Sequence, residues 1–130
     1  MKHVLFLCSQ NRLRSPTAEK VFSGRPGFEV ASAGLNHMSF EVPDVDAVFK
    51  DHEWLKKLGK YDHMWGVGRH LLGSQVYDYW SDPWGRVHER WADTDRLNAR
   101  SGSNLLSASE GLVSQWGEDP PERFIKHVST

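Results

Sequence analysis

The sequence predicts an α+β fold in which an N-terminal βαβ element is joined to a β-α-β-β-β unit. Three observations support this prediction: the length of 130 residues, the order of the periodic segments, and the glycine- and proline-containing turns between them. A chain of this length supplies a single domain with a core of ordinary size. Hydrophobic residues at 38% and aromatic residues at 12% indicate a globular protein and exclude a disordered chain.

Charge and cysteine content exclude several classes of protein. The 16 Lys and Arg residues balance the 17 Asp and Glu residues to a formal net charge of −1, so bulk charge does not favour nucleic-acid binding. The single cysteine, Cys8, excludes an intramolecular disulfide framework and fits a reducing compartment. No apolar run approaches the ~7–15 residues of a signal core or the ~18 of a membrane span. We therefore expect a soluble, cytoplasmic protein with no nucleic-acid partner and no membrane partner.

The N-terminal segment predicts a strand, a helix and a second strand. Val4–Leu7 is a short apolar run that predicts a buried strand, and Phe28–Ser32 predicts another. Between them, Ser15 is a suitable N-cap, and Pro16 fits the first helical turn because its missing N–H costs nothing there. Gly24 is placed where such a helix ends.

The middle of the chain repeats the strand-then-helix order and continues with strands alone. Alternation over His37–Val42 predicts a strand, and Pro43 and Asp44 open a helix that closes at Gly59. Glycines and the turn at Ser81–Gly85 separate the segments that follow. Three further strands are predicted at His63–Val67, Gln75–Trp80 and Arg86–Trp91.

Residues 93–130 predict an irregular C-terminal extension. They are rich in Ser, Asn, Gly, Asp and Pro, and their apolar residues are spaced too irregularly to indicate a helix or a strand. A segment that wraps over a surface and a partly disordered terminus explain this pattern equally well.

A thiol and a basic loop lie between the first predicted strand and helix. Cys8 ends the strand, and Arg14 stands at the helix start, where backbone N–H groups favour an anion. Arg14 suits bidentate contact with a phosphate, and the same positive surroundings favour a Cys8 thiolate. The alternative is a buried strand-end cysteine beside a solvated loop. The segment resembles the N-terminus of low-molecular-weight protein tyrosine phosphatases, which implies Cys8 as nucleophile, Arg14 as phosphate clamp, Asn11 and Ser15 as loop supports, and no cofactor.

A carboxylate and a histidine are expected to meet on one face of the sheet. Alternation places Glu89 beside Val87 and Trp91 on an apolar face, where a carboxylate is costly unless a partner or a metal ion holds it. His37 lies on the face of its strand that is turned away from the helix, so the two side chains can converge. A histidine and a carboxylate that leave other coordination positions of a metal ion open suit Fe(II) or Mn(II). The alternative is a Glu paired with Arg or Lys and a structural histidine.

The order of several short segments carries a second resemblance, which runs from about Leu35 to the C-terminus. These segments resemble the final module of the type I extradiol dioxygenases, which belong to the vicinal oxygen chelate superfamily and are built from β-α-β-β-β modules. The segments are Leu35–Val42, Gly68–His70, Tyr77–Trp80, Asp82–Gly85 and His88–Glu89.

The resemblance implies an enzyme whose Fe(II) binds a catechol and dioxygen together and opens the ring beside the hydroxyl groups. It implies His37 and Glu89 as metal ligands, His70 as the acid-base group and Tyr79 as a hydrogen-bond partner of the substrate oxygen. In that family the other histidine ligand comes from a preceding module, so the site within this chain is incomplete. The aromatic residues near these positions are expected either to line a pocket or to fill the core: Tyr77, Trp80, Trp84 and Trp91.

The two resemblances predict three regions: a phosphatase-like fragment over 1–35, the dioxygenase-like module over 36–92 and the extension over 93–130. A homodimer that joins two modules is expected, because an exposed sheet edge invites pairing. Three functions follow, in this order: an incomplete extradiol dioxygenase acting on a small aromatic diol, a cysteine phosphatase or oxyanion-binding protein, and a catalytically inert chimera.

Overall fold

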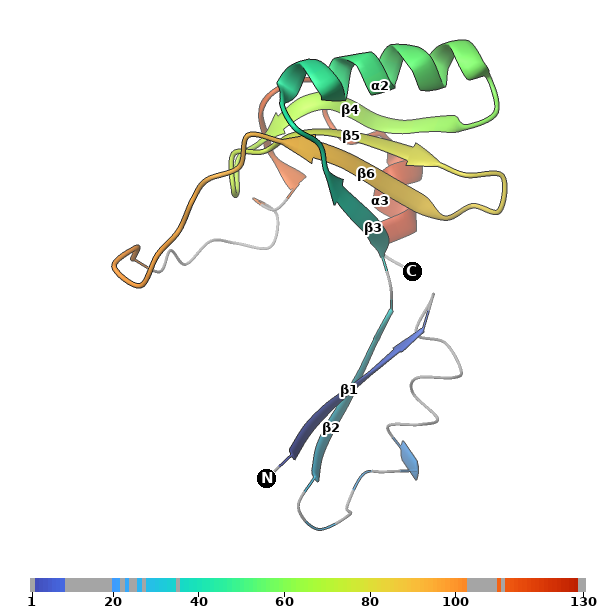
Figure 1. Cartoon of the computed structure of the whole chain (residues 1–130). Coiled ribbons are helices and arrows are strands. Elements are labelled where there is room, and N and C mark those ends of the chain that lie inside the picture. Colours follow the sequence, from blue (N-terminus) through green and yellow to red (C-terminus); the bar gives the residue numbers. More distant parts are fainter. Residues whose placement is uncertain are drawn as a thin grey trace. The chain divides into compact units, whose positions relative to one another are not determined.

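A computed structural model of the chain divides into two compact units, an N-terminal unit spanning Met1–Asn36 and a C-terminal unit spanning His37–Ser129 (Figure 1). Each unit has a β-sheet of its own. Among the helices of the described residues, none is long and apolar enough to cross a membrane. The structure describes residues 2–8, 20–21, 23, 26, 28–34, 36–102, 110 and 112–128.

The N-terminal unit holds two parallel strands, β1 (Lys2–Cys8) and β2 (Phe28–Gly34), which pair along their whole length. Parallel neighbours need a crossover connection, so this pairing agrees with the predicted βαβ order. Most of the predicted helix lies outside the described residues, and the oxyanion site at Cys8 stays a prediction. The residues predicted to surround the Cys8 thiol also lie outside them: Asn11, Arg14 and Ser15.

The C-terminal unit is built on a five-stranded sheet with the order β3-β6-β5-β4-β7. Strand β3 runs parallel to β6, and the other neighbours are antiparallel. This order places the first strand of the unit beside the fourth, so residues distant in sequence meet on adjacent strands. The strands are β3 (His37–Glu41), β4 (Asp62–His70), β5 (Val76–Ser81), β6 (Val87–Ala92) and β7 (Ser114–Trp116).

Helix α2 (Val45–Leu58) connects β3 to β4 and packs against one face of the sheet (Figure 1). Asp44 caps its N-terminus by accepting a hydrogen bond from the Ala47 N–H at 2.8 Å. Gly59 ends the helix in the left-handed region, with a φ of 63°, and donates its N–H to the Leu55 carbonyl. The predicted helix limits are therefore confirmed, and β3 to β6 follow the predicted β-α-β-β-β order.

Alternation along β5 gives the two faces of the sheet separate cores. On the side of α2, Val76 packs with Val48 of the helix and Ala92 of β6. On the other side, Tyr77 and Tyr79 belong to a second, largely aromatic cluster. The remaining buried members of that cluster are Met64, Trp65, Val87 and Phe124.

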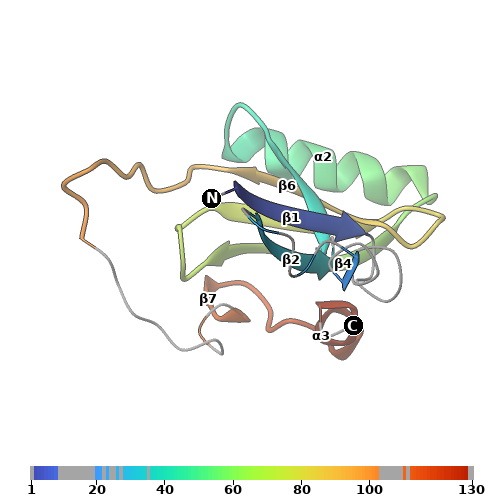
Figure 2. The ribbon, with the colours of Figure 1, turned by 90° about the horizontal axis from the view of Figure 1, so that it is seen from below.

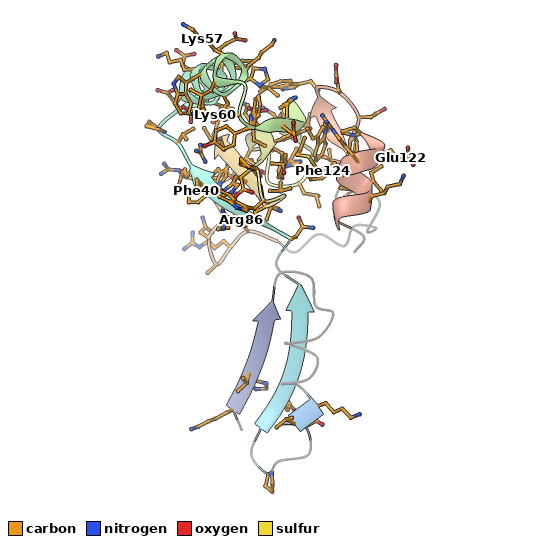
Figure 3. All side chains as sticks on the ribbon, turned by 90° about the vertical axis from the view of Figure 1, so that its right-hand side faces the viewer. Phe40, Lys57, Lys60, Arg86, Glu122 and Phe124 are labelled. Atoms are coloured by element: carbon orange, nitrogen blue, oxygen red, sulfur yellow. The ribbon has the colours of Figure 1, made fainter. Side chains whose placement is uncertain are left out.

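Helix α3 (Glu122–Val128) packs on the aromatic cluster, on the side of the sheet opposite to α2 (Figure 2). The ring of Phe124 lies 4.9 Å from the rings of both Trp65 and Tyr79, measured between centroids, and only 2% of the residue is exposed. Figure 3 shows Phe124 on the side of α3 that faces the sheet and Glu122 on the outer side. One aromatic side chain therefore anchors the helix.

The elements β7 and α3 differ from the prediction of an irregular extension over 93–130. The physical reason is length. A strand of three residues is too short to show alternation, and a helix of seven residues is shorter than the ~11–18-residue window over which helical periodicity can be recognised, although Phe124 and Val128 stand four positions apart. Tertiary contacts with β4 and the aromatic cluster define these elements, and such contacts leave little trace in local sequence.

Replacing Phe124 with alanine should lower the free energy of unfolding by about 3–5 kcal/mol, because it removes a buried ring from the aromatic cluster. Urea unfolding monitored by tryptophan fluorescence measures this change. Ile125→Ala on the same helix is the matched control, since Ile125 is 39% exposed, and its loss should be clearly smaller. Equal losses in the two variants would show that α3 does not depend on Phe124.

Candidate metal centre

Glu89 places a carboxylate inside the aromatic face of the sheet. It lies in the middle of β6 and is 3% exposed. The sheet register puts it opposite Ser39 of β3 on one side and Tyr79 of β5 on the other. A buried carboxylate is costly unless charged or hydrogen-bonding groups hold it, so the side chains around Glu89 define the site.

His37 and Ser39 both approach Oε2 of Glu89. The distance from His37 Nε2 to Oε2 is 3.2 Å, and the Ser39 hydroxyl donates to the same oxygen at 2.5 Å. The two residues share a face because they are two positions apart on β3. The structure thus brings together the histidine and the carboxylate that the sequence predicted to converge.

The other carboxylate oxygen, Oε1 of Glu89, is buried and accepts no hydrogen bond from any described residue. His70 Nε2 lies 3.5 Å away, a distance that we treat as an electrostatic contact because it is long for a hydrogen bond. Leaving a buried acceptor without a donor costs roughly 1–3 kcal/mol. Oε1 is therefore an acceptor that a cation would satisfy.

His70 and Tyr79 form a second polar pair beside Glu89. His70 Nε2 lies 3.0 Å from the Tyr79 hydroxyl, and the residues are 8% and 4% exposed. The His70 ring stacks on Tyr77 with centroids 3.8 Å apart, and the His37 ring meets Tyr79 edge-on at 5.2 Å. The four side chains that the resemblance singled out therefore lie together on one face.

The charges at this site are set by burial and by polar contacts. Burial by itself would raise the pKa of Glu89. Polar contacts, the strongest of them with His37 and His70, outweigh the effect of burial and lower the pKa to about 2. Burial, followed by the negative charge of Glu89, raises the pKa of Tyr79 far above its ordinary value. At neutral pH the site therefore presents an ionised carboxylate beside a protonated phenol.

An imidazole nitrogen and a carboxylate fit a divalent transition metal, and Glu89 Oε1 supplies an acceptor without a donor. A 2-His-1-carboxylate site needs a third ligand. Among the described residues, no further His, Cys, Asp or Glu forms a group of three with His37 and Glu89 within 4.8 Å. The site is therefore two thirds of such a centre, and the roles of its residues as ligands stay predictions.

The four aromatic residues do not all share one pocket: Trp80 and Trp84 line a cavity on the side of α2, and Tyr77 fills the aromatic cluster on the other face. Tyr77 and Trp80 lie on opposite faces of β5: Tyr77 is in the aromatic cluster, whereas the Trp80 indole donates to Asp78 at 2.5 Å on the side of α2. Trp84 is 78% exposed in the turn after β5. In that turn the Asp82 carboxylate accepts the backbone N–H groups of Trp84 and Arg86, a structural role.

Besides β7 and α3, sequence reasoning missed two groups of polar side chains in the C-terminal unit. The first is Ser39, which donates to Glu89 and was hidden in the polar face of a predicted strand. The second is a cluster of His52, His63 and Asp78 on the side of α2. The available signal was Asp78 itself, a carboxylate that alternation places on the same face of β5 as Val76.

No protein-family model matches the chain. Metapyrocatechase 2 from Cupriavidus necator is 37% identical over 99 residues, which are 75% of this chain and 31% of that protein. The chain thus spans about a third of the length of this curated relative.

Three solved structures share the fold of the chain. A Mn(II)-bound glyoxalase from Novosphingobium aromaticivorans is 24% identical, with a TM-score of 0.57 over 73% of this chain and 33% of that one. A catechol 2,3-dioxygenase is 18% identical, with a TM-score of 0.52 over 71% of this chain and 30% of that one. A halotolerant catechol dioxygenase is 18% identical, with a TM-score of 0.56 over 72% and 31%.

The sheet order and these likenesses show that the C-terminal unit has a fold consistent with a module of the vicinal oxygen chelate type. The likeness to metapyrocatechase 2 supports an extradiol dioxygenase-like module in particular, and coverage of about a third of each relative agrees with an incomplete one. The N-terminal unit and its phosphatase-like loop gain no support from these likenesses.

In protein freed of metal, acid should destabilise the fold through Glu89. Its folded pKa of about 2 lies below the ordinary 4.5, so its contribution is complete above pH 4.5 and is lost as the pH falls towards 2. Between pH 6 and pH 3 this loss amounts to about 2 kcal/mol. Urea unfolding at both pH values should show a smaller difference in Glu89→Gln; an unchanged difference would contradict the ionised state of Glu89.

Proposed function

We propose that this chain supplies the metal-binding and acid-base half of an extradiol ring-cleaving site for a small aromatic diol. The observation that carries the proposal is the buried Glu89 Oε1, an acceptor with no described donor, in a carboxylate that also contacts His37. The relatives named as catechol dioxygenases and metapyrocatechase support the substrate class. The relative described as Mn(II)-bound supports a divalent transition metal, and we propose Fe(II), or Mn(II) in its place.

His37 and Glu89 would hold the metal ion through one imidazole nitrogen and one carboxylate oxygen. When bound, the ion would supply the open positions at which a diol and dioxygen meet and exchange electrons. The Ser39 hydroxyl would keep the carboxylate oriented, because it donates to Oε2 and leaves Oε1 without a described donor.

His70 would exchange a proton with the substrate, and the Tyr79 hydroxyl would position the His70 imidazole. Tyr79 stays protonated at neutral pH because burial and the charge of Glu89 raise its pKa. Its hydroxyl lies 3.0 Å from His70 Nε2, so the pair forms a short path for a proton between a substrate oxygen and the imidazole. The buried surroundings of both residues limit competition from water.

The third ligand would come from a second module. The relatives are about three times as long as the matched segment, and the described residues complete no triad at Glu89. We propose that a second copy of the chain pairs with this one and completes the site in a homodimer. The strand order leaves β3 and β7 as the edges of the sheet, and edge strands are suited to such pairing.

Protein reconstituted with Fe(II) without oxygen, then mixed with 2,3-dihydroxybiphenyl in air, should yield a yellow ring-opened product. Glu89→Gln should abolish the product because it removes a charged ligand. His70→Gln should lower the rate by about 10²–10⁴-fold while Fe(II) is still bound. Absorbance and iron analysis of each variant measure these outcomes.

His88→Gln is the matched control. His88 is a neighbour of Glu89 on β6, but it faces the other side of the sheet, where its Nε2 lies 3.4 Å from Asp82. Its rate should equal that of the parent protein. Iron bound in the parent and in Glu89→Gln alike, or no product from an iron-loaded dimer, would contradict the proposed function.

A further inference from the structure

A second cluster of metal-ligating groups lies on the face of β5 opposite to Tyr79. Asp78 is its centre and has no exposed surface. His63 Nε2, from β4, lies 2.8 Å from Oδ1, and His52 Nδ1, from α2, lies 3.1 Å from Oδ2. Three elements that are separate in sequence thus direct two imidazoles at one buried carboxylate.

The spacing of these atoms fits a tetrahedral cation. One ligand atom from each residue can be chosen so that all lie within 4.8 Å of one another. With Zn–N and Zn–O distances near 2.0–2.1 Å, neighbouring ligands of a tetrahedral Zn²⁺ stand about 3.3 Å apart. The two imidazoles lie at distances near that value from the carboxylate, His63 at 2.8 Å from Oδ1 and His52 at 3.1 Å from Oδ2. A cation bound by both imidazoles and the carboxylate would take the place of these two hydrogen bonds.

The surroundings of Asp78 resemble those of a metal-binding carboxylate. The Trp80 indole donates to Oδ2 at 2.5 Å, which fixes the carboxylate from outside the cluster as hydrogen-bond donors do in metal sites. Gly66 leaves room beside the other oxygen, since a Cβ on it would come within 2.9 Å of Oδ1. A residue with a side chain at this position would close the space next to the ligand atom.

We propose that His52, His63 and Asp78 form a second divalent-metal site, of the kind that takes Zn²⁺, separate from the centre at Glu89. Two imidazoles and a carboxylate are ligands that Zn²⁺ prefers. The side chain of His63 is 32% exposed, so a water molecule can take the fourth position from that side. The cation balances the fully buried charge of Asp78 and links α2 to β4 and β5.

Titration of the metal-stripped full chain with ZnCl₂ in a calorimeter tests this site. The background is Glu89→Gln, which removes the proposed metal centre on the other face. We expect about one Zn²⁺ per chain, with a Zn²⁺-dependent rise in melting temperature. Adding His63→Gln should weaken binding by more than the 10–100-fold that loss of an outer-shell partner causes, and should abolish the rise.

Two further variants test whether the bound Zn²⁺ lies at the cluster of His52, His63 and Asp78. Trp80→Phe keeps all three ligands but loses the donor to Oδ2, so its affinity should fall by about 10–100-fold. His88→Gln removes a partly buried histidine next to a different carboxylate, Asp82, and should leave binding unchanged. Where His63→Gln does not fold, His52→Gln removes another ligand and should give the same loss.

Absence of bound Zn²⁺ in the Glu89→Gln background would overturn the proposal. Equal affinity after removal of either histidine ligand would overturn it too. Because Glu89 is already replaced, these outcomes do not depend on ring-cleaving activity, and failure of one proposal leaves the other in place.

Discussion

The burial of a carboxylate at Glu89 is the constraint on which the site depends. Only 3% of the residue is exposed, and its pKa is held near 2, so a negative charge sits within an aromatic core. His37, Ser39 and His70 surround it, yet Oε1 accepts no hydrogen bond from a described residue. These contacts stabilise the charge, but the buried Oε1 atom still lacks a donor among the described residues, and a cation would complete the site.

Successive side chains of a strand point to opposite faces of the sheet, and this alternation places the two polar clusters, one around Glu89 and one around Asp78, on opposite faces. On β5, Tyr79 faces Glu89, whereas Asp78 faces α2 and is held by two histidines. Parallel pairing of β3 with β6 then brings His37 beside Glu89 across 52 residues of chain. A register shift of one residue would exchange the faces and dissolve both clusters.

Much of the C-terminal unit could be predicted because local patterns decide it. Asp44 and Gly59 cap the two ends of helix α2 and so set its limits, and alternation placed Glu89 on the buried face. The His52–His63–Asp78 cluster was missed because its members come from a helix and two strands whose packing is tertiary. Helix α3 was missed because it spans only seven residues, and tertiary contacts such as those of Phe124 define it. The third metal ligand, if it comes from another module, has no signal in this sequence at all.

Diffraction from crystals soaked in MnCl₂, recorded at the manganese absorption edge, tests the central claim most directly. We expect an anomalous peak within about 2.3 Å of His37 Nε2 and a Glu89 carboxylate oxygen, with the third protein ligand donated by a neighbouring chain. A fully occupied manganese peak elsewhere, with no peak beside His37 and Glu89, would contradict it.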